Sequence, residues 1–271
     1  MTIKPYDLIV CDLDGTLLDQ HKRLSEFTIR TIKCITSFVP VILATARAPR
    51  DIEAYMEQLE LTGPIICYNG AMVYSFKDKL PLVTFDLELE ACMALVHDLR
   101  HQTFVSNILV EQQNQFWVDS MDEDVQMWVD MGCEPHAIGY PTSFFDKKIS
   151  KIMAKGDCEQ IIRHVYQHYD GLRHMYSDSK RTWVEFIHCD AGKERALEWL
   201  LGDMGISKEK TIAFGDADND LPLLQTAGCG VAMGNAADEV KQFADLVIGT
   251  NEDSSVARYL DHIFKLEMGV E

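Results

Sequence analysis

Short apolar segments that alternate with helical segments constrain this chain more than any other feature. Asp7–Leu13 (DLIVCDL), Val39–Thr45 and Pro64–Cys67 are mostly apolar and rich in β-branched residues, as is typical of strands buried on both faces of a sheet. Helical patterns separate these segments, and the alternation returns after about Asp190, with a further strand at Lys210–Phe214. The pattern predicts an α/β fold with a parallel sheet and right-handed crossovers.

The middle of the chain has a different order of elements. From about Leu87 to His188 we expect helix, strand pair, helix, strand, helix and strand pair, which indicates an α+β unit inserted into the α/β domain. With 271 residues, the chain is long enough for two domains. We therefore predict a core domain at residues 1–85 and 190–271, and an inserted domain at residues 86–189.

The chain carries 43 acidic and 25 basic residues, for a formal net charge of -18. Such a charge repels nucleic acid and anionic membranes, so we expect neither as a partner. It also repels an anionic substrate unless a local cation offsets the field. We expect a monomer or a small homo-oligomer.

The eight cysteines include no C-x-x-C pair, which argues for a reducing compartment and against a zinc or disulfide framework. No long apolar stretch precedes Asp12, and no segment has the apolar length of a membrane span. We therefore expect a cytoplasmic protein without a signal peptide.

The run Asp12-Leu13-Asp14-Gly15-Thr16-Leu17-Leu18-Asp19 directly follows the first predicted strand. Ligands of open α/β sheets bind outside the carboxyl ends of the strands. An ionised carboxylate such as Asp12 can attack phosphorus and form an aspartyl-phosphate. Asp14 can then protonate the leaving oxygen and deprotonate the attacking water. The alternative is an ordinary Asp-Gly turn after a strand, but the length of the run favours function.

Two further segments offer groups that bind phosphate. Thr45, within Ala44-Thr45-Ala46-Arg47, has a hydroxyl next to backbone N–H groups near a helix start, although a threonine here can equally cap the helix. Lys193 is a compact cation near the start of a helix, where the helix dipole disfavours positive charge. The alternative for Lys193 is a solvated surface charge.

Gly215-Asp216-Ala217-Asp218-Asn219-Asp220 follows the strand at Lys210–Phe214. Its three carboxylates repel one another unless a cation is present. Mg²⁺ takes oxygen ligands, and Asp216, Asp12 and the backbone carbonyl of Asp14 form a suitable partial set. An N-cap with an acidic first helical turn is the alternative.

These four segments match, in order and type, the signature motifs of the haloacid dehalogenase-like superfamily. Tyr68-Asn69-Gly70-Ala71 and Val231-Ala232-Met233-Gly234-Asn235-Ala236 further resemble its Cof-type subfamily, which has a C2B-type cap. The resemblance covers roughly residues 5–85 and 190–265. It implies a Rossmann-like parallel-sheet core, with the inserted α+β domain as a mobile cap that determines substrate specificity. The second motif reads T-A-R instead of T-G-R, and the third reads K-E-R where K-G is usual.

The resemblance also implies a role for each site residue. Asp12 is the nucleophile, and Asp14 is the general acid and base. The implied phosphate-binding positions are Leu13, Thr45, Ala46, Lys193 and Asn219. The implied Mg²⁺ positions are Asp12, Asp14 through its carbonyl, Asp216, and Asp220 in support of the ligands. Possible substrate contacts are Arg47, Asn69 and, in the cap, Arg181.

We therefore expect a Mg²⁺-dependent phosphatase that hydrolyses small phosphomonoesters, such as sugar phosphates, through an aspartyl-phosphate. A sugar phosphomutase is the alternative, because it can use the same D-x-D start and return the phosphate to sugar. A non-catalytic sensor of phosphate ligands is a third reading. It is disfavoured by the presence of Asp12, Asp14, Lys193 and Asp216.

Overall fold

The computed structural model of the chain describes residues 5–140, 148–177 and 180–268. The chain divides into two compact units, one formed by the chain up to Val83 and from Gly192 onward, and the other by Thr84–Ala191. Residues 1–4 and 269–271 of the predicted core, and 141–147 and 178–179 of the predicted cap, lie outside the described residues.

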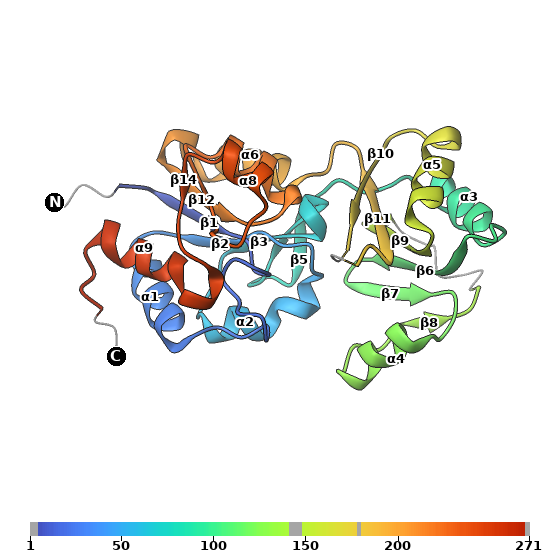
Figure 1. The fold of residues 1–271 in the computed structure, drawn as a ribbon, viewed down its shortest axis with the longest axis horizontal. Helices are drawn as coiled ribbons and strands as arrows, with labels where there is room; N and C mark the ends of the chain where they lie inside the picture. The colour runs from blue at the N-terminus through green and yellow to red at the C-terminus, as the bar shows by residue number, and fades with distance from the viewer. Residues whose placement is uncertain (1–4, 141–147, 178–179, 269–271) are drawn as a thin grey trace. The chain divides into compact units, whose positions relative to one another are not determined.

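The first unit is built on a five-stranded sheet in the order β14-β13-β12-β1-β2 (Figure 1). Every neighbouring pair in this sheet is parallel, so the predicted parallel α/β core is confirmed. Its strands are β1 (Leu8–Cys11), β2 (Val41–Leu43), β12 (Thr211–Gly215), β13 (Cys229–Ala232) and β14 (Leu246–Val247). β1, β2 and β12 are buried along their whole length, which explains their apolar sequences.

Six α-helices belong to this unit in the described part of the chain. They are α1 (Glu26–Thr36), α2 (Glu53–Gln58), α6 (Lys193–Met204), α7 (Leu221–Thr226), α8 (Asp238–Phe243) and α9 (Ser255–Phe264). Ser25 caps α1 by accepting a hydrogen bond from the N–H of Thr28 at 3.0 Å. No helix in the described part of the chain is long and apolar enough to cross a membrane.

An antiparallel extension follows the parallel sheet, and the strand pattern did not predict it. The strands β3 (Pro64–Cys67), β4 (Met72–Ser75) and β5 (Leu80–Thr84) form a separate sheet in that order. β3 and β4 are antiparallel, and a single parallel bridge between Ala44 and Ile66 joins β3 to the end of β2. β4 therefore returns along β3 through the short Tyr68–Ala71 turn, with no crossover helix.

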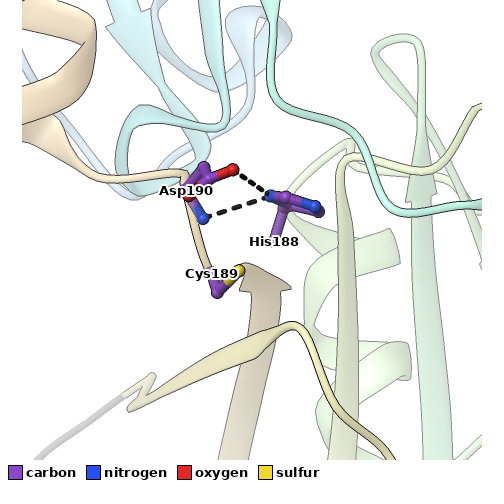
Figure 2. A group of neighbouring side chains, drawn as sticks. All are labelled: His188, Cys189 and Asp190. Carbon is purple, nitrogen blue, oxygen red and sulfur yellow. Dashed lines mark hydrogen bonds and ion pairs between the residues drawn. The ribbon is translucent and has the colours of Figure 1, made fainter.

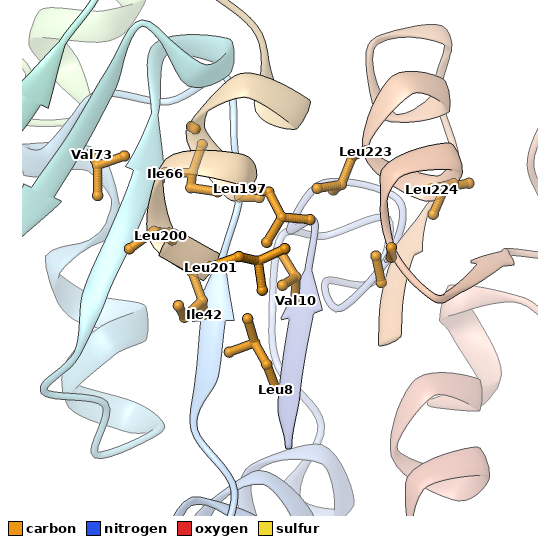
Figure 3. Close-up of a cluster of buried hydrophobic side chains, with 14 of the residues drawn as sticks. Leu8, Val10, Ile42, Ile66, Val73, Leu197, Leu200, Leu201, Leu223 and Leu224 are labelled. Atoms are coloured by element: carbon orange, nitrogen blue, oxygen red, sulfur yellow. The ribbon is translucent and has the colours of Figure 1, made fainter. Parts of the chain in front are cut away.

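The core of the first unit lies where the central strands meet α6 and α7. Leu8 and Val10 share one face of β1, because strand side chains alternate between faces, and they belong to the same buried cluster as Leu197 of α6 (Figure 3). All three are fully buried. Burying such a side chain stabilises the fold by about 1.5–3 kcal/mol. This packing holds β1 and the start of α6 in fixed positions.

The second unit has a six-stranded sheet in the order β10-β11-β9-β6-β7-β8, antiparallel except for the pair β7 and β8. Its strands are β6 (Val105–Gln112), β7 (Gln115–Val118), β8 (Ala137–Ile138), β9 (Lys151–Gly156), β10 (Leu172–Tyr176) and β11 (Trp183–His188). Its helices are α3 (Leu89–Leu99), α4 (Glu123–Asp130) and α5 (Cys158–His168). α3 and α5 enclose a core of their own with one face of the sheet, as expected of an α+β unit.

Candidate active site

Polar residues at the carboxyl ends of three neighbouring strands form the candidate site. Asp12 follows β1, Thr45 follows β2 after the bridge residue Ala44, and Asp216 follows β12. β1 lies between β12 and β2, and all three strands run parallel. Their carboxyl ends therefore meet at one edge of the sheet, which brings the first, second and fourth motifs together.

The loop after β1 is folded around the main chain of Leu13. The carbonyl of Leu13 accepts hydrogen bonds from the N–H groups of residues 16–18, at 2.9–3.3 Å. Leu13 is fully buried, and its apolar side chain offers a ligand no polar group. Gly15 in this loop has φ +85°, and a Cβ there would lie 2.2 Å from Oδ2 of Asp216. Only glycine permits this close approach of the first motif to the fourth.

Three carboxylates gather at this edge. Oxygen atoms of Asp12, Asp216 and Asp220 lie within 4.8 Å of one another, and Asp12 and Asp220 are only 5% and 1% exposed. Burial and then the nearby Asp220 raise the pKa of Asp12 well above its ordinary value, although Lys193 opposes this. Burial and Asp220 also raise the pKa of Asp216 to about 6. This charge density and the oxygen-only ligand set fit a hard cation such as Mg²⁺.

Lys193 offsets part of this negative charge. Its buried ammonium donates hydrogen bonds to Oδ1 of Asp12 at 2.7 Å and to Oδ1 of Asp220 at 2.6 Å. Burial favours the neutral amine, but the two carboxylates outweigh it and raise the pKa of Lys193 above its ordinary value. The second oxygen of Asp220 accepts hydrogen bonds from the N–H groups of Asp216 and Ala217, at 3.0 and 3.1 Å. Asp220 thus ties the lysine to the fourth motif.

The Tyr68–Gly70 turn supports the start of α6. Gly70 has φ +91°, and a Cβ there would lie 2.1 Å from the carbonyl oxygen of Gly192 and 2.5 Å from the nitrogen of Lys193. The turn after β3 therefore packs directly against the backbone that carries the catalytic-site lysine. This contact gives the Tyr68-Asn69-Gly70-Ala71 motif a physical role in positioning Lys193.

Asp14 is held by two cations. Arg47 donates from Nε to Oδ2 and from Nη2 to Oδ1 of Asp14, both at 2.7 Å, and Lys22 donates to Oδ1 at 2.6 Å. Burial alone would raise the pKa of Asp14, but these partners, led by Arg47, hold it below its ordinary value. The hydroxyl of Tyr55 donates to the carbonyl of Lys22 at 2.9 Å and lies 3.4 Å from Nη1 of Arg47. The predicted substrate contact Arg47 is thus engaged with the predicted acid and base.

Three further predicted residues lie at the same strand ends. Thr45 is buried, and its hydroxyl accepts a hydrogen bond from the N–H of Arg47 at 3.2 Å. Ala46 lies between them in the chain. Asn219 donates from Nδ2 to Oδ1 of Asn69 at 2.7 Å, which joins the loop after β12 to the turn after β3.

Arg181 belongs to the second unit. It adopts a left-handed conformation with φ +54°, and its guanidinium carbon lies 4.4 Å from the ring centre of Tyr176. Its predicted contact with substrate stays a prediction.

Two asparagines that were given no role in the sequence analysis hold the loop after β1. Asn235 donates to the carbonyl of Gly15 at 2.9 Å, and Asn251 donates to the carbonyl of Leu18 at 2.8 Å. The N–H of Asn251 in turn donates to Oδ1 of Asn235 at 3.1 Å. The sequence signal for Asn235 is its place in the Val231–Ala236 motif, three residues after the end of β13.

Comparison with known proteins identifies the family of this chain. Residues 9–260 match the family described as haloacid dehalogenase-like hydrolase. The chain belongs to this family. It is 34% identical to the 5-amino-6-(5-phospho-D-ribitylamino)uracil phosphatase YitU of Bacillus subtilis, over 98% of this chain and 100% of that protein. It is 25% identical to the pyridoxal phosphate phosphatase YbhA of Escherichia coli, over 93% of this chain and 97% of that one.

Solved structures of the family have the same fold. A haloacid dehalogenase-like hydrolase from Bacteroides thetaiotaomicron is 27% identical, with a TM-score of 0.83 over 96% of this chain and 100% of that chain. The family predicted from the four motifs is therefore confirmed, and this chain is a hydrolase of the haloacid dehalogenase-like type.

Proposed function

We propose that this hydrolase is a Mg²⁺-dependent phosphatase of small phosphomonoesters that works through an aspartyl-phosphate on Asp12. One observation carries the proposal. The buried carboxylate of Asp12 lies at the end of β1, within hydrogen-bonding distance of the buried Lys193 ammonium and within 4.8 Å of Asp216 and Asp220. The nucleophile Asp12, the phosphate-binding ammonium of Lys193 and a site for a metal cation thus lie together.

In the first half-reaction, an oxygen of Asp12 attacks phosphorus and the bond from phosphorus to the substrate oxygen breaks. Asp14 takes up a proton once its carboxylate is released from Arg47 and Lys22, and it gives this proton to the leaving oxygen. Lys193 holds the negative phosphoryl oxygens. In the second half-reaction, Asp14 takes a proton from water, and the water oxygen attacks phosphorus. Phosphate leaves and the Asp12 carboxylate is restored. Thr45 and the main chain of Leu13 and Ala46 supply further hydrogen bonds to phosphate.

The donor set fits Mg²⁺, which would neutralise charge on the phosphoryl group when bound. Asp12, Asp216 and the carbonyl of Asp14 would hold it. Both oxygens of Asp220 already accept hydrogen bonds, from Lys193 and from two backbone N–H groups. Asp220 therefore supports the site by orienting its neighbours. We assign Asn219 a contact with phosphate from its place beside Asn69.

The substrate class is a small phosphorylated metabolite. The names of two relatives support this, since one acts on 5-amino-6-(5-phospho-D-ribitylamino)uracil and another on pyridoxal phosphate. We assign substrate selection to the inserted unit as a cap, with Arg181 as a contact, and Asn69 as a contact from the core. The eight cysteines are all free, which fits a cytoplasmic location.

The test is phosphate release from a panel of sugar phosphates, pyridoxal phosphate and a generic aryl phosphate, with Mg²⁺ and with a chelator. Release that requires Mg²⁺ is the expected result. Conversion of one sugar phosphate into its isomer without release would favour a phosphomutase. Binding of the panel without turnover by folded, Mg²⁺-loaded protein would favour a sensor.

A further inference from the structure

Three consecutive side chains at the end of β11 and in the turn that follows it can ligate a metal (Figure 2). They are His188, the last residue of β11, and the turn residues Cys189 and Asp190. They offer an imidazole nitrogen, a thiol sulfur and a carboxylate oxygen, and these three atoms lie within 4.8 Å of one another. All three residues belong to the Thr84–Ala191 unit. Ligand atoms about 2.0–2.3 Å from a tetrahedral metal lie roughly 3–4 Å apart, so only small side-chain movements would close the set.

The backbone of this turn is held by hydrogen bonds. The N–H of Cys189 donates to the carbonyl of Gly171 at 2.8 Å, and the N–H of Ala191 donates to the carbonyl of His188 at 2.9 Å. Arg173 donates from Nη1 to the carbonyl of Ala191, also at 2.8 Å. The three side chains therefore project from a backbone that is already ordered, which lowers the entropic cost of gathering them around an ion.

The ring of His188 contacts Asp190 through Nδ1. The backbone N–H of Asp190 donates to Nδ1 of His188 at 3.1 Å, and Oδ2 of Asp190 lies 3.8 Å from the same nitrogen (dashed lines in Figure 2). A backbone N–H can only donate, so Nδ1 carries a lone pair in this arrangement. A cation bound at Nδ1 would take the place of this N–H donor, and the Asp190 carboxylate lies close enough to attract it.

We propose that His188, Cys189 and Asp190 form a three-ligand site for a borderline-soft divalent cation, of which Zn²⁺ is the representative, with the fourth position open to water. Thiolate and imidazole ligands select Zn²⁺ over Mg²⁺, which prefers oxygen. The Asp12 cluster offers only oxygen, so the two sites select different metals. The side chains of His188 and Asp190 are 32% and 68% exposed, which leaves the turn accessible to ions.

This site goes beyond the proposed function, because no step of phosphate hydrolysis uses it. It also refines the expectation from cysteine spacing. The lack of a C-x-x-C pair argues against a cysteine framework around zinc, but a mixed site on three adjacent residues needs only one cysteine.

Co²⁺ is the probe for the test, because a thiolate bound to Co²⁺ gives a charge-transfer band in the near ultraviolet. Full-length protein is saturated with Mg²⁺ to fill the Asp12 cluster and is then titrated with Co²⁺. We expect the band to saturate at one Co²⁺ per chain and to disappear when Zn²⁺ is added. Cys189→Ser should abolish it. His188→Gln and Asp190→Asn should each weaken Co²⁺ binding by about 10- to 100-fold or more.

Two matched variants control the test. Cys34→Ser changes another partly accessible thiol, in α1, and should leave the band intact. Asp12→Asn disrupts the oxygen cluster and should also leave it intact. A wild-type protein without a thiolate band would overturn the proposal, as would a band that persists in Cys189→Ser. Because Cys189 is exposed, its replacement is not expected to unfold the protein, and His188→Gln provides an independent check.

Discussion

At the scale of single residues, Asp12 is the position on which the proposed chemistry depends. Asp12→Asn removes the nucleophilic carboxylate but keeps the shape of the side chain. We expect kcat to fall by roughly 10³-fold or more, with the thermal unfolding midpoint maintained. Phosphate release and a thermal melt measure the two effects. Asp218→Asn, an exposed carboxylate of the fourth motif, is the control and should retain turnover. Wild-type activity in Asp12→Asn would reject the nucleophile.

The pairing of Arg47 with Asp14 leads to a second prediction at this scale. Arg47→Gln removes both charge-assisted hydrogen bonds that orient the acid and base. Turnover of alkyl phosphates, whose leaving oxygen needs a proton, should fall by about 10²-fold, which is within the usual contribution of acid-base catalysis. An aryl phosphate, with its better leaving group, should be affected much less.

Lys22→Gln is the matched control for this prediction, because the Lys22 side chain is 57% exposed and exposed ion pairs contribute only about 0–1 kcal/mol. It should change both rates less than Arg47→Gln does. Equal losses on alkyl and aryl phosphates in Arg47→Gln would indicate that Arg47 contacts the substrate directly.

At the scale of elements, the contact between the Tyr68–Gly70 turn and the start of α6 can be tested with one methyl group. Gly70 and Gly132 both have φ near +90°, but a Cβ meets the backbone of Gly192 and Lys193 only at Gly70; Gly132 has nothing within 4 Å. Because alanine disfavours the left-handed conformation, an alanine at either position should lower the free energy of unfolding by about 1 kcal/mol.

Gly70→Ala should therefore lose more stability than Gly132→Ala and should also lower kcat, because Lys193 is displaced. Urea unfolding and phosphate release measure the two effects. If the two variants are equally stable and equally active, then the turn does not position the lysine.

At the scale of the whole molecule, the acidic cluster links stability to pH and to metal. The pKa of Asp216 is raised from 3.8 to about 6 in the folded protein. The folded state therefore binds this proton more tightly than the unfolded state, so its stabilising contribution is present below pH 3.8 and is lost as the pH rises through about 6.

Without metal, the free energy of unfolding of the wild type should fall by on the order of 2 kcal/mol relative to that of Asp216→Asn as the pH rises from about 4 to about 7. Urea unfolding in the presence of a chelator measures this difference. Added Mg²⁺ binds the folded state, so it should stabilise the wild type near pH 7 more than it stabilises Asp216→Asn. A pH-independent difference between the two proteins would contradict the charge-repulsion account of the cluster.

The sequence alone determined the family, the α/β class and the convergence of Asp12, Thr45 and Asp216. These follow from local patterns. Buried strands can be recognised by their apolar, β-branched composition, and the carboxyl ends of parallel strands share one edge of the sheet. Lys193 was also found from the sequence, as a cation misplaced at a helix start.

Tertiary structure alone decided which side chains touch. The pairing of Asp14 with Arg47, the support of Lys193 by Gly70 and the gathering of His188, Cys189 and Asp190 depend on the path of the backbone in space. The pattern of alternating strands and helices likewise did not predict the sheet β3-β4-β5, in which β4 runs antiparallel to β3. Secondary structure produces a periodic pattern of apolar residues in the sequence, but contacts between segments distant in the chain do not.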